Sequence, residues 1–124
     1  MLTLPPSTRI YLCTEPCDMR RGFDGLLAEA RRRCQEDPLG GHLFIFVGKR
    51  KHHLKVLFWQ SGGLCIFAKR LELGCFRLPK VLPGQTSLQL AAVDLAMLLD
   101  GIDLGQVRRQ KLFEPARSLT TICN

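Results

Sequence analysis

Residues Gly41 to Pro79 read GHLFIFVGKRKHHLKVLFWQSGGLCIFAKRLELGCFRLP. Short apolar and aromatic segments alternate here with turns rich in glycine or in basic residues, which is typical of antiparallel strands joined by tight connections. The expected strands are Leu43 to Val47, Leu54 to Trp59, Leu64 to Arg70 and a short one around Phe76, with a turn at Gly62-Gly63.

Both faces of this expected sheet are apolar. In the first strand Leu43, Ile45 and Val47 point to one face, while Phe44 and Phe46 point to the other. A helix can cover one face. The second face requires a C-terminal helix, a partner protein or a second copy of the chain.

The segment before the sheet predicts a short strand at Arg9 to Cys13 and a helix at Met19 to Cys34, with Asp18 as its N-cap. At helical spacing one stripe is apolar and is expected to be buried: Met19, Phe23, Leu26, Leu27, Ala30 and Cys34. Gly22 and Gly25 each cost a helix about 1 kcal/mol, which indicates either close packing against the sheet or a later helix start.

A second helix is expected at Ala91 to Asp100, ending at Gly101 with an apolar contact from Ile102. Its N-cap is Ala91 or, alternatively, Thr86 or Ser87. The predicted fold class is α+β, an antiparallel meander of about four to five strands with two helices packed on it. Residues 1–103 form the expected domain, and residues 104–124 a basic C-terminal tail.

The composition is that of a globular, basic protein. With 124 residues, 46% of them hydrophobic, the chain can form one modest core. Its formal charge of +7 and pI near 9.5 favour polyanions as partners, nucleic acid first and an anionic membrane surface second. Met1 to Pro6 lacks the pattern of a signal peptide, and no segment approaches the roughly 20 apolar residues of a membrane span, so the expected location is the cytoplasm without membrane contact.

The six cysteines contain no CxxC pair, and reduced thiols are expected in a cytosolic protein. The alternative is a zinc site that uses Cys13 and Cys17 with His42, His52 or His53, because thiolate and imidazole are the ligands that zinc prefers.

The densest positive cluster is the expected turn from Gly48 to His53. A basic hairpin tip can reach a phosphate backbone or a groove of DNA, although the same charges also keep a small sheet soluble. Neighbouring strands and the first helix extend this surface. The predicted DNA-binding residues are Lys49, Arg50, Lys51, Lys55, Lys69, Arg70, Arg20, Arg21 and Arg31, with Arg32 on the same helix face.

Other side chains of types that can bind a ligand or act in catalysis have simpler interpretations. Phe58, Trp59 and Phe67 could stack on unpaired bases, but aromatics at strand spacing are usually core. His52 and His53 are expected to be solvated turn residues.

The acidic residues Asp18, Asp24, Asp94, Asp100 and Asp103 do not supply the three-carboxylate arrangement of a nuclease, and no nucleophile elbow or phosphate loop is present. We therefore expect no catalysis, no metal and no cofactor.

Three blocks resemble one family: DMRRGFDGL at Asp18 to Leu26, the meander, and LAMLLDGID at Leu95 to Asp103. The chain resembles the TnpB-type accessory protein, the second open reading frame product, of bacterial insertion sequences of the sixty-six type. The resemblance covers most of residues 9–103.

This resemblance implies a non-catalytic accessory role in DNA transposition. The partners it implies are double-stranded DNA at insertion-sequence ends and a separately encoded transposase, with a homo-oligomer left open. Two alternatives remain. One is a protein-interaction module that docks the transposase or another accessory subunit without binding DNA, and the other is a metal-dependent nuclease, which would need a metal-binding cluster.

Overall fold

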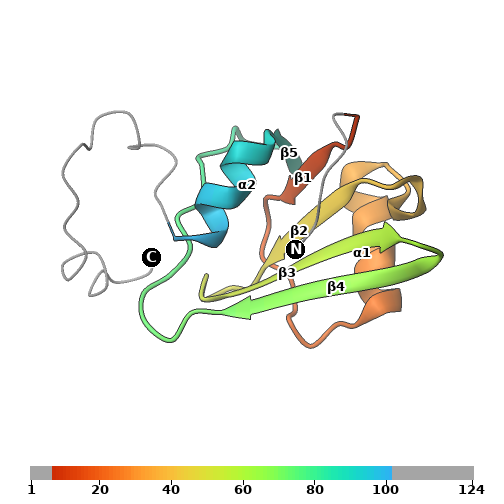
Figure 1. Ribbon diagram of the computed structural model, residues 1–124. Coiled ribbons are helices and arrows are strands. Elements are labelled where there is room, and N and C mark those ends of the chain that lie inside the picture. Colours follow the sequence, from red (N-terminus) through yellow and green to blue (C-terminus); the bar gives the residue numbers. More distant parts are fainter. Residues whose placement is uncertain (1–6, 102–124) are drawn as a thin grey trace.

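A five-stranded sheet with the strand order β4-β3-β2-β1-β5 is the framework of the protein, and the computed structural model describes residues 7–101 (Figure 1). Together with two α-helices this sheet confirms the predicted α+β class. The elements are β1 (Ile10–Cys13), α1 (Phe23–Cys34), a 3-10 turn η1 (Pro38–Gly40), β2 (Leu43–Val47), β3 (His53–Gln60), β4 (Gly63–Arg70), β5 (Ser87–Leu90) and α2 (Ala92–Leu99).

Strands β2, β3 and β4 form the predicted antiparallel meander. Ile45 pairs with Val56, and Val56 pairs with Phe67, so one row of apolar side chains crosses all three strands. The β3–β4 turn has positive φ at Ser61 and Gly62, which suits a tight hairpin. The alternating apolar pattern therefore predicts the first and last residues of these strands almost to the residue.

The edge of the sheet differs from the expected meander. β1 pairs with β2 in parallel, because α1 carries the chain across the sheet between them, and β5 pairs antiparallel with β1. No strand forms around Phe76. That residue is 1% exposed because the connection between β4 and β5 packs it into the core, and its N–H donates to the carbonyl of Lys51 at 2.6 Å.

Helix α1 begins later than the predicted Met19. Its N-cap is Gly22 rather than Asp18, so the alternative of a later start is the correct one. Asp18 instead accepts a hydrogen bond from the backbone N–H of Arg20 at 2.9 Å, which closes a local turn before the helix. Phe23 lies in the first turn and is 52% exposed, so its assignment to the buried stripe was wrong.

One face of the sheet is covered by α1. Leu26 and Ala30 are fully buried against it, and Met19, Leu27 and Cys34 contribute partly buried contacts. The sheet residues of this layer are Tyr11, Cys13, Phe44, Phe46 and Leu57.

The other face is covered by α2 and by the connection that carries Phe76. Leu95 and Leu98 of α2 pack on a layer that includes Ile10, Leu12, Leu43, Ile45, Val47, Leu54, Val56, Phe58 and Leu90. Of the three covers that the sequence left open for this face, the C-terminal helix is the one that the structure provides.

The caps of α2 show how a poor cap residue is compensated. Ala91 is the N-cap, and its N–H donates to Oδ2 of Asp94 at 3.0 Å, so the cap does not move to Thr86 or Ser87. Gly101 has a φ of 82°, which suits the residue after a helix end. The predicted contact of Ile102 lies outside the described residues, as does the tail.

Cys13, Cys17, Cys34 and Cys65 are free thiols, as expected. Cys75 is disulfide-bonded, so the expectation of reduced cysteines fails there. Within residues 7–101 no helix combines the length and apolar character needed to span a membrane.

Candidate nucleic-acid interface

The turn between β2 and β3 projects the densest positive charge from a fixed backbone. The N–H of Gly48 donates to the carbonyl of His53, and the N–H of Lys51 donates to the carbonyl of Gly48, each at 3.0 Å. Lys51 has a φ of 63°, and its own carbonyl accepts from Phe76. The side chains of Lys49 and Arg50 are exposed on this closed turn.

Lys49 and Arg50 have no competing partner in the part of the chain that the structure describes. Neither side chain makes a hydrogen bond or an ion pair with residues 7–101. Both cationic groups can therefore bind an anionic ligand without first breaking a contact within residues 7–101.

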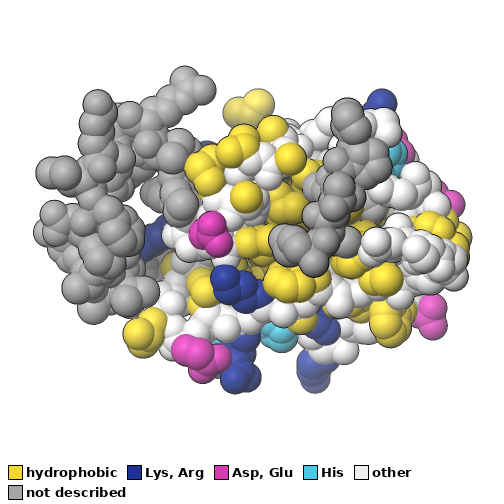
Figure 2. Space-filling model, in the orientation of Figure 1, with side chains coloured by type: hydrophobic (Ala, Val, Ile, Leu, Met, Phe, Trp, Pro, Cys, Tyr) yellow, Lys and Arg dark blue, Asp and Glu magenta, His cyan; other side chains and the backbone are white. Residues whose placement is uncertain are grey.

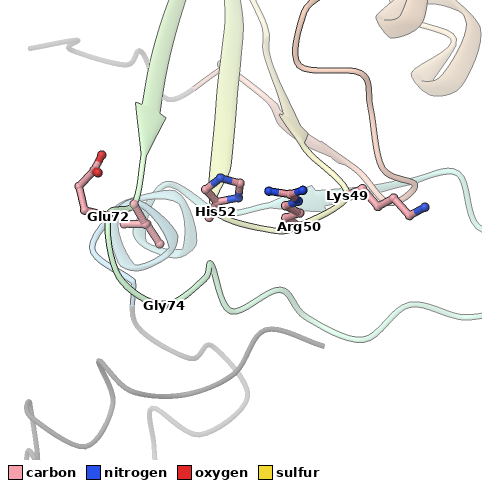
Figure 3. A pocket seen from close by; sticks show the side chains of 6 residues that line it. Lys49, Arg50, His52, Glu72 and Gly74 are labelled. Carbon is pink, nitrogen blue, oxygen red and sulfur yellow. The ribbon is translucent and has the colours of Figure 1, made fainter.

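An open pocket of about 740 Å³ lies beside this turn (Figure 3). Its lining residues are Lys49, Arg50, His52, Leu71, Glu72 and Gly74. In the view of Figure 3, the side chains of His52 and Arg50 lie between those of Glu72 and Lys49. Glu72 was not among the predicted site residues. Its position just beyond a strand end is only a weak signal for a residue that lines a pocket.

The segment before α1 lies against the same turn. The contact is so close that a Cβ at Gly48 would lie 2.8 Å from Cγ of Met19. Nζ of Lys55 donates to the carbonyl of Arg21 at 3.0 Å. Arg20 and Arg21, expected as part of a separate helix surface, therefore adjoin the hairpin.

We call this region the hairpin end, and it also includes the nearby end of β4. Its basic residues are Lys49, Arg50, Lys51, Lys55, Lys69, Arg70, Arg20 and Arg21. Figure 2 shows Lys and Arg side chains gathered beside a histidine along one border of the molecule.

All three arginines of the hairpin end are paired with acids, Arg21 only through a 3.8 Å contact with Glu29. Arg20 is 91% exposed and binds Asp18 through a 3.0 Å ion pair, and the hydrogen bonds from Arg20 lower the pKa of Asp18 to about 2. Nε of Arg70 lies 3.1 Å from a carboxylate oxygen of Glu72. Exposed pairs of this kind are weak, so a phosphate can compete for Arg20 or Arg70.

Two of the predicted DNA-binding lysines make hydrogen bonds between elements of the fold. Besides the contact of Lys55 with Arg21, Nζ of Lys69 donates to the carbonyl of Leu99 at the C-terminal end of α2. A cation at this position satisfies a carbonyl that lacks an intrahelical partner. Both lysines stay predicted DNA-binding residues, but each ammonium group already has a structural contact.

Arg31 lies apart, at the C-terminal end of α1, where it pairs with Asp37 at 3.1 Å. Its neighbours Arg32 and Arg33 both bind Oε1 of Glu29 at 2.6 Å. Burial raises the pKa of Glu29, but the hydrogen bonds and charges of Arg32 and Arg33 outweigh it and lower the pKa overall. The i,i+3 and i,i+4 spacing from Glu29 could have revealed this cluster.

The histidines differ from the expected solvated pair. His53 is the first residue of β3 and is half-buried, and His52 lines the pocket. Burial, followed by the positive charges of Lys55, His52 and Arg70, lowers the pKa of His53. His53 is therefore neutral near pH 7.

The zinc alternative gains no support from the described residues. His42 accepts a hydrogen bond from the backbone N–H of Arg9 at 3.0 Å. Within residues 7–101 no three His, Cys, Asp or Glu side chains come together as a metal site would require.

The aromatic residues do not form a common stacking platform. Phe58 is 9% exposed in the core under α2, as expected. Trp59 and Phe67 are 37% and 43% exposed, so the expectation that they are core residues is wrong, and their strand positions place them on opposite faces of the sheet.

Comparison with known proteins assigns the chain to a family. Residues 8–109 match the family model described as IS66 Orf2 like protein. The uncharacterized protein y4jC of Sinorhizobium fredii is 33% identical over 109 residues, which span 88% of this chain and 92% of that protein. The uncharacterized protein y4hO of the same organism is 35% identical over 103 residues, spanning 83% and 88%. No solved structure matches. The chain therefore belongs to the IS66 Orf2-like family of insertion-sequence accessory proteins.

Proposed function

We propose that this accessory protein binds double-stranded DNA through the hairpin end and thereby assists a separately encoded transposase. The observation that carries the proposal is the pair of exposed cations, Lys49 and Arg50, on a turn whose backbone is closed by hydrogen bonds. A fixed turn loses little conformational freedom when it binds, so the attraction to phosphate is not offset by ordering of the backbone.

The surrounding cations enlarge this surface. Arg20, Arg21 and Arg70 lie around the turn, and their acidic partners are themselves exposed or only loosely paired, as in the 3.8 Å contact of Arg21 with Glu29. Exchange of the exposed carboxylates of Asp18 and Glu72 for a DNA phosphate costs little. Lys55 and Lys69 would act mainly by positioning the segment before α1 and the end of α2.

Phosphate contacts of this kind give affinity that depends on salt but carry no sequence information. We therefore expect the protein to bind different duplexes with similar affinity. Any preference for insertion-sequence ends would come from DNA shape or from the transposase.

The test is binding of the purified chain to fluorescent duplexes that carry an insertion-sequence end or a scrambled sequence, at low and near-physiological salt. Binding to both with a steep salt dependence supports the proposal. Lys49→Glu should weaken binding strongly, whereas Lys80→Glu, which changes the net charge equally from outside the hairpin end, should have a small effect. Circular dichroism verifies that both variants fold. Unchanged binding by folded Lys49→Glu would contradict the assignment.

A second candidate is a docking module for the transposase, favoured by the outer face of α2. Val93 is 61% exposed there, and Ala92 and Ala96 are also exposed. Hydrophobic side chains gather over α2 in Figure 2. Binding of purified transposase that Val93→Asp abolishes, together with no binding to either duplex, would favour this candidate.

A further inference from the structure

Two free thiols from distant parts of the sequence meet beside the sheet. Sγ of Cys13 lies 3.7 Å from Sγ of Cys34. Cys13 is the last residue of β1 and is 2% exposed, and Cys34 is the last residue of α1 and is half-buried. Both are free, so this is a reduced pair in contact.

The backbones on either side of the thiols are held together by contacts that do not involve sulfur. The guanidinium of Arg33 donates to the carbonyl of Glu15 at 2.7 Å, and the hydroxyl of Thr86 donates to the carbonyl of Arg33 at 2.8 Å. These bonds tie the end of α1 to the segment after β1 and to the residue before β5. A disulfide needs an S–S distance of about 2.05 Å, so small side-chain rotations would have to close the remaining gap while the backbones stay in place.

The two thiols differ in access and in acidity. Cys34 is half-buried whereas Cys13 is 2% exposed, so Cys34 is the more accessible of the two to a small molecule in solvent. The hydrogen bond with Cys13 lowers the pKa of Cys34, whereas the same contact and then burial raise the pKa of Cys13. Since the thiolate is the nucleophile, Cys34 would react first and Cys13 second.

We propose that Cys13 and Cys34 form a thiol–disulfide exchange site for low-molecular-weight disulfides of the glutathione type. The Cys34 thiolate attacks one sulfur of the small disulfide, forms a mixed disulfide and releases one small thiolate. Cys13 then loses its proton and attacks Sγ of Cys34, which forms the Cys13–Cys34 bond and releases the second small thiolate. The protein loses two electrons and two protons, and the small disulfide is reduced to two thiols.

The oxidised bond would connect the ends of β1 and α1 and close the chain between residues 13 and 34. A cross-link of this kind restricts the unfolded chain. We expect a higher midpoint of thermal unfolding after oxidation, and its return to the original value after reduction. This inference does not depend on DNA binding.

The experiment uses the folded full chain and oxidised glutathione as the probe. Peptide mapping without reductant should find Cys13 linked to Cys34 in the wild-type chain. Cys13→Ser should retain glutathione on Cys34 as a stable mixed disulfide, because the second attack is lost. Cys34→Ser should take up no glutathione at Cys13, which is buried. Cys65→Ser serves as the matched control, since this half-buried free thiol lies on β4, and should still form the Cys13–Cys34 bond.

Three results would overturn the proposal. The first is a Cys34 that does not react in the folded wild-type chain, and the second is a bond from Cys34 to Cys17 in place of Cys13. The third is a Cys13→Ser variant that carries no glutathione on Cys34 after treatment with oxidised glutathione. Peptide mapping identifies which cysteine carries the glutathione or the disulfide in each variant. A moderate loss of stability in one variant therefore does not prevent the test.

Discussion

Two basic regions of the molecule carry the same kinds of side chain in opposite surroundings. At the β2–β3 turn, Lys49 and Arg50 are exposed and make no side-chain pair with residues 7–101. At the end of α1, the three arginines 31–33 are all bound to carboxylates or backbone carbonyls. A net charge of +7 therefore does not locate a binding surface, because internal acids can engage the longest run of arginines.

The largest effect is expected from breaking the α1 region. Arg33 and Glu29 have side chains only 9% and 10% exposed, and Arg33→Ala leaves a buried carboxylate with fewer partners. We expect a loss of about 3 kcal/mol in the free energy of unfolding, measured by urea denaturation.

Arg32→Ala is the matched control for this prediction. Arg32 binds the same oxygen of Glu29, but its side chain is 63% exposed, so the expected loss is below about 1 kcal/mol. Equal losses for the two variants would mean that burial does not distinguish the two arginines.

The second prediction compares the two regions directly on DNA. Replacing both Lys49 and Arg50 with alanine should lower the slope of log affinity against log salt by about 2, since roughly one unit is lost for each phosphate contact. Replacing both Arg31 and Arg32 with alanine removes the same charge and should leave the slope nearly unchanged. If both double variants lose the same slope, binding follows net charge alone and the hairpin end has no special role.

How much of the fold the sequence predicts depends on how local each signal is. The strand Leu43–Val47 was predicted to the residue, because its two apolar faces and flanking turns lie within the segment itself. The strand Ser87–Leu90 was missed since only its pairing with β1 makes it a strand. Phe76 was misassigned because burial in an irregular connection gives the same apolar signal as burial in a strand.

The candidate site was predicted only in part for a similar reason. The basic turn is visible in the sequence, and so are the exposed Lys49 and Arg50. The carbonyl partners of Lys55 and Lys69 are not visible, because they lie 34 and 30 residues away along the chain and depend on how the elements pack. A lysine that binds DNA and a lysine that ties two elements look alike in a sequence.

The third prediction tests whether the hairpin and the segment before α1 form one surface. A methyl group at Gly48 would approach Cγ of Met19 to 2.8 Å, so Gly48→Ala should cost about 1 kcal/mol through overpacking. Gly63→Ala is the control, because its nearest neighbour, the carbonyl oxygen of Gln60, is 3.9 Å away, and the change should stay within about 0.5 kcal/mol. The cost of Gly48→Ala should shrink in a Met19→Ala background if this contact is the cause.

The smallest expected effect concerns Arg20, which is almost fully exposed yet paired with Asp18. The side-chain hydrogen bond from Arg20 and then its backbone N–H hold the pKa of Asp18 at about 2. Because this pKa is lowered on folding, the pair stabilises the protein above the ordinary carboxyl pKa of about 3.8, and the contribution is lost as the pH falls through about 2. Arg20→Gln should raise the pKa of Asp18 only part of the way to its ordinary value, since the backbone hydrogen bond remains. Carboxyl-carbon NMR titration measures both values. If Arg20→Gln leaves the pKa unchanged, Arg20 does not pair with Asp18 in solution, and the hairpin end then offers DNA a third unengaged cation beside Lys49 and Arg50.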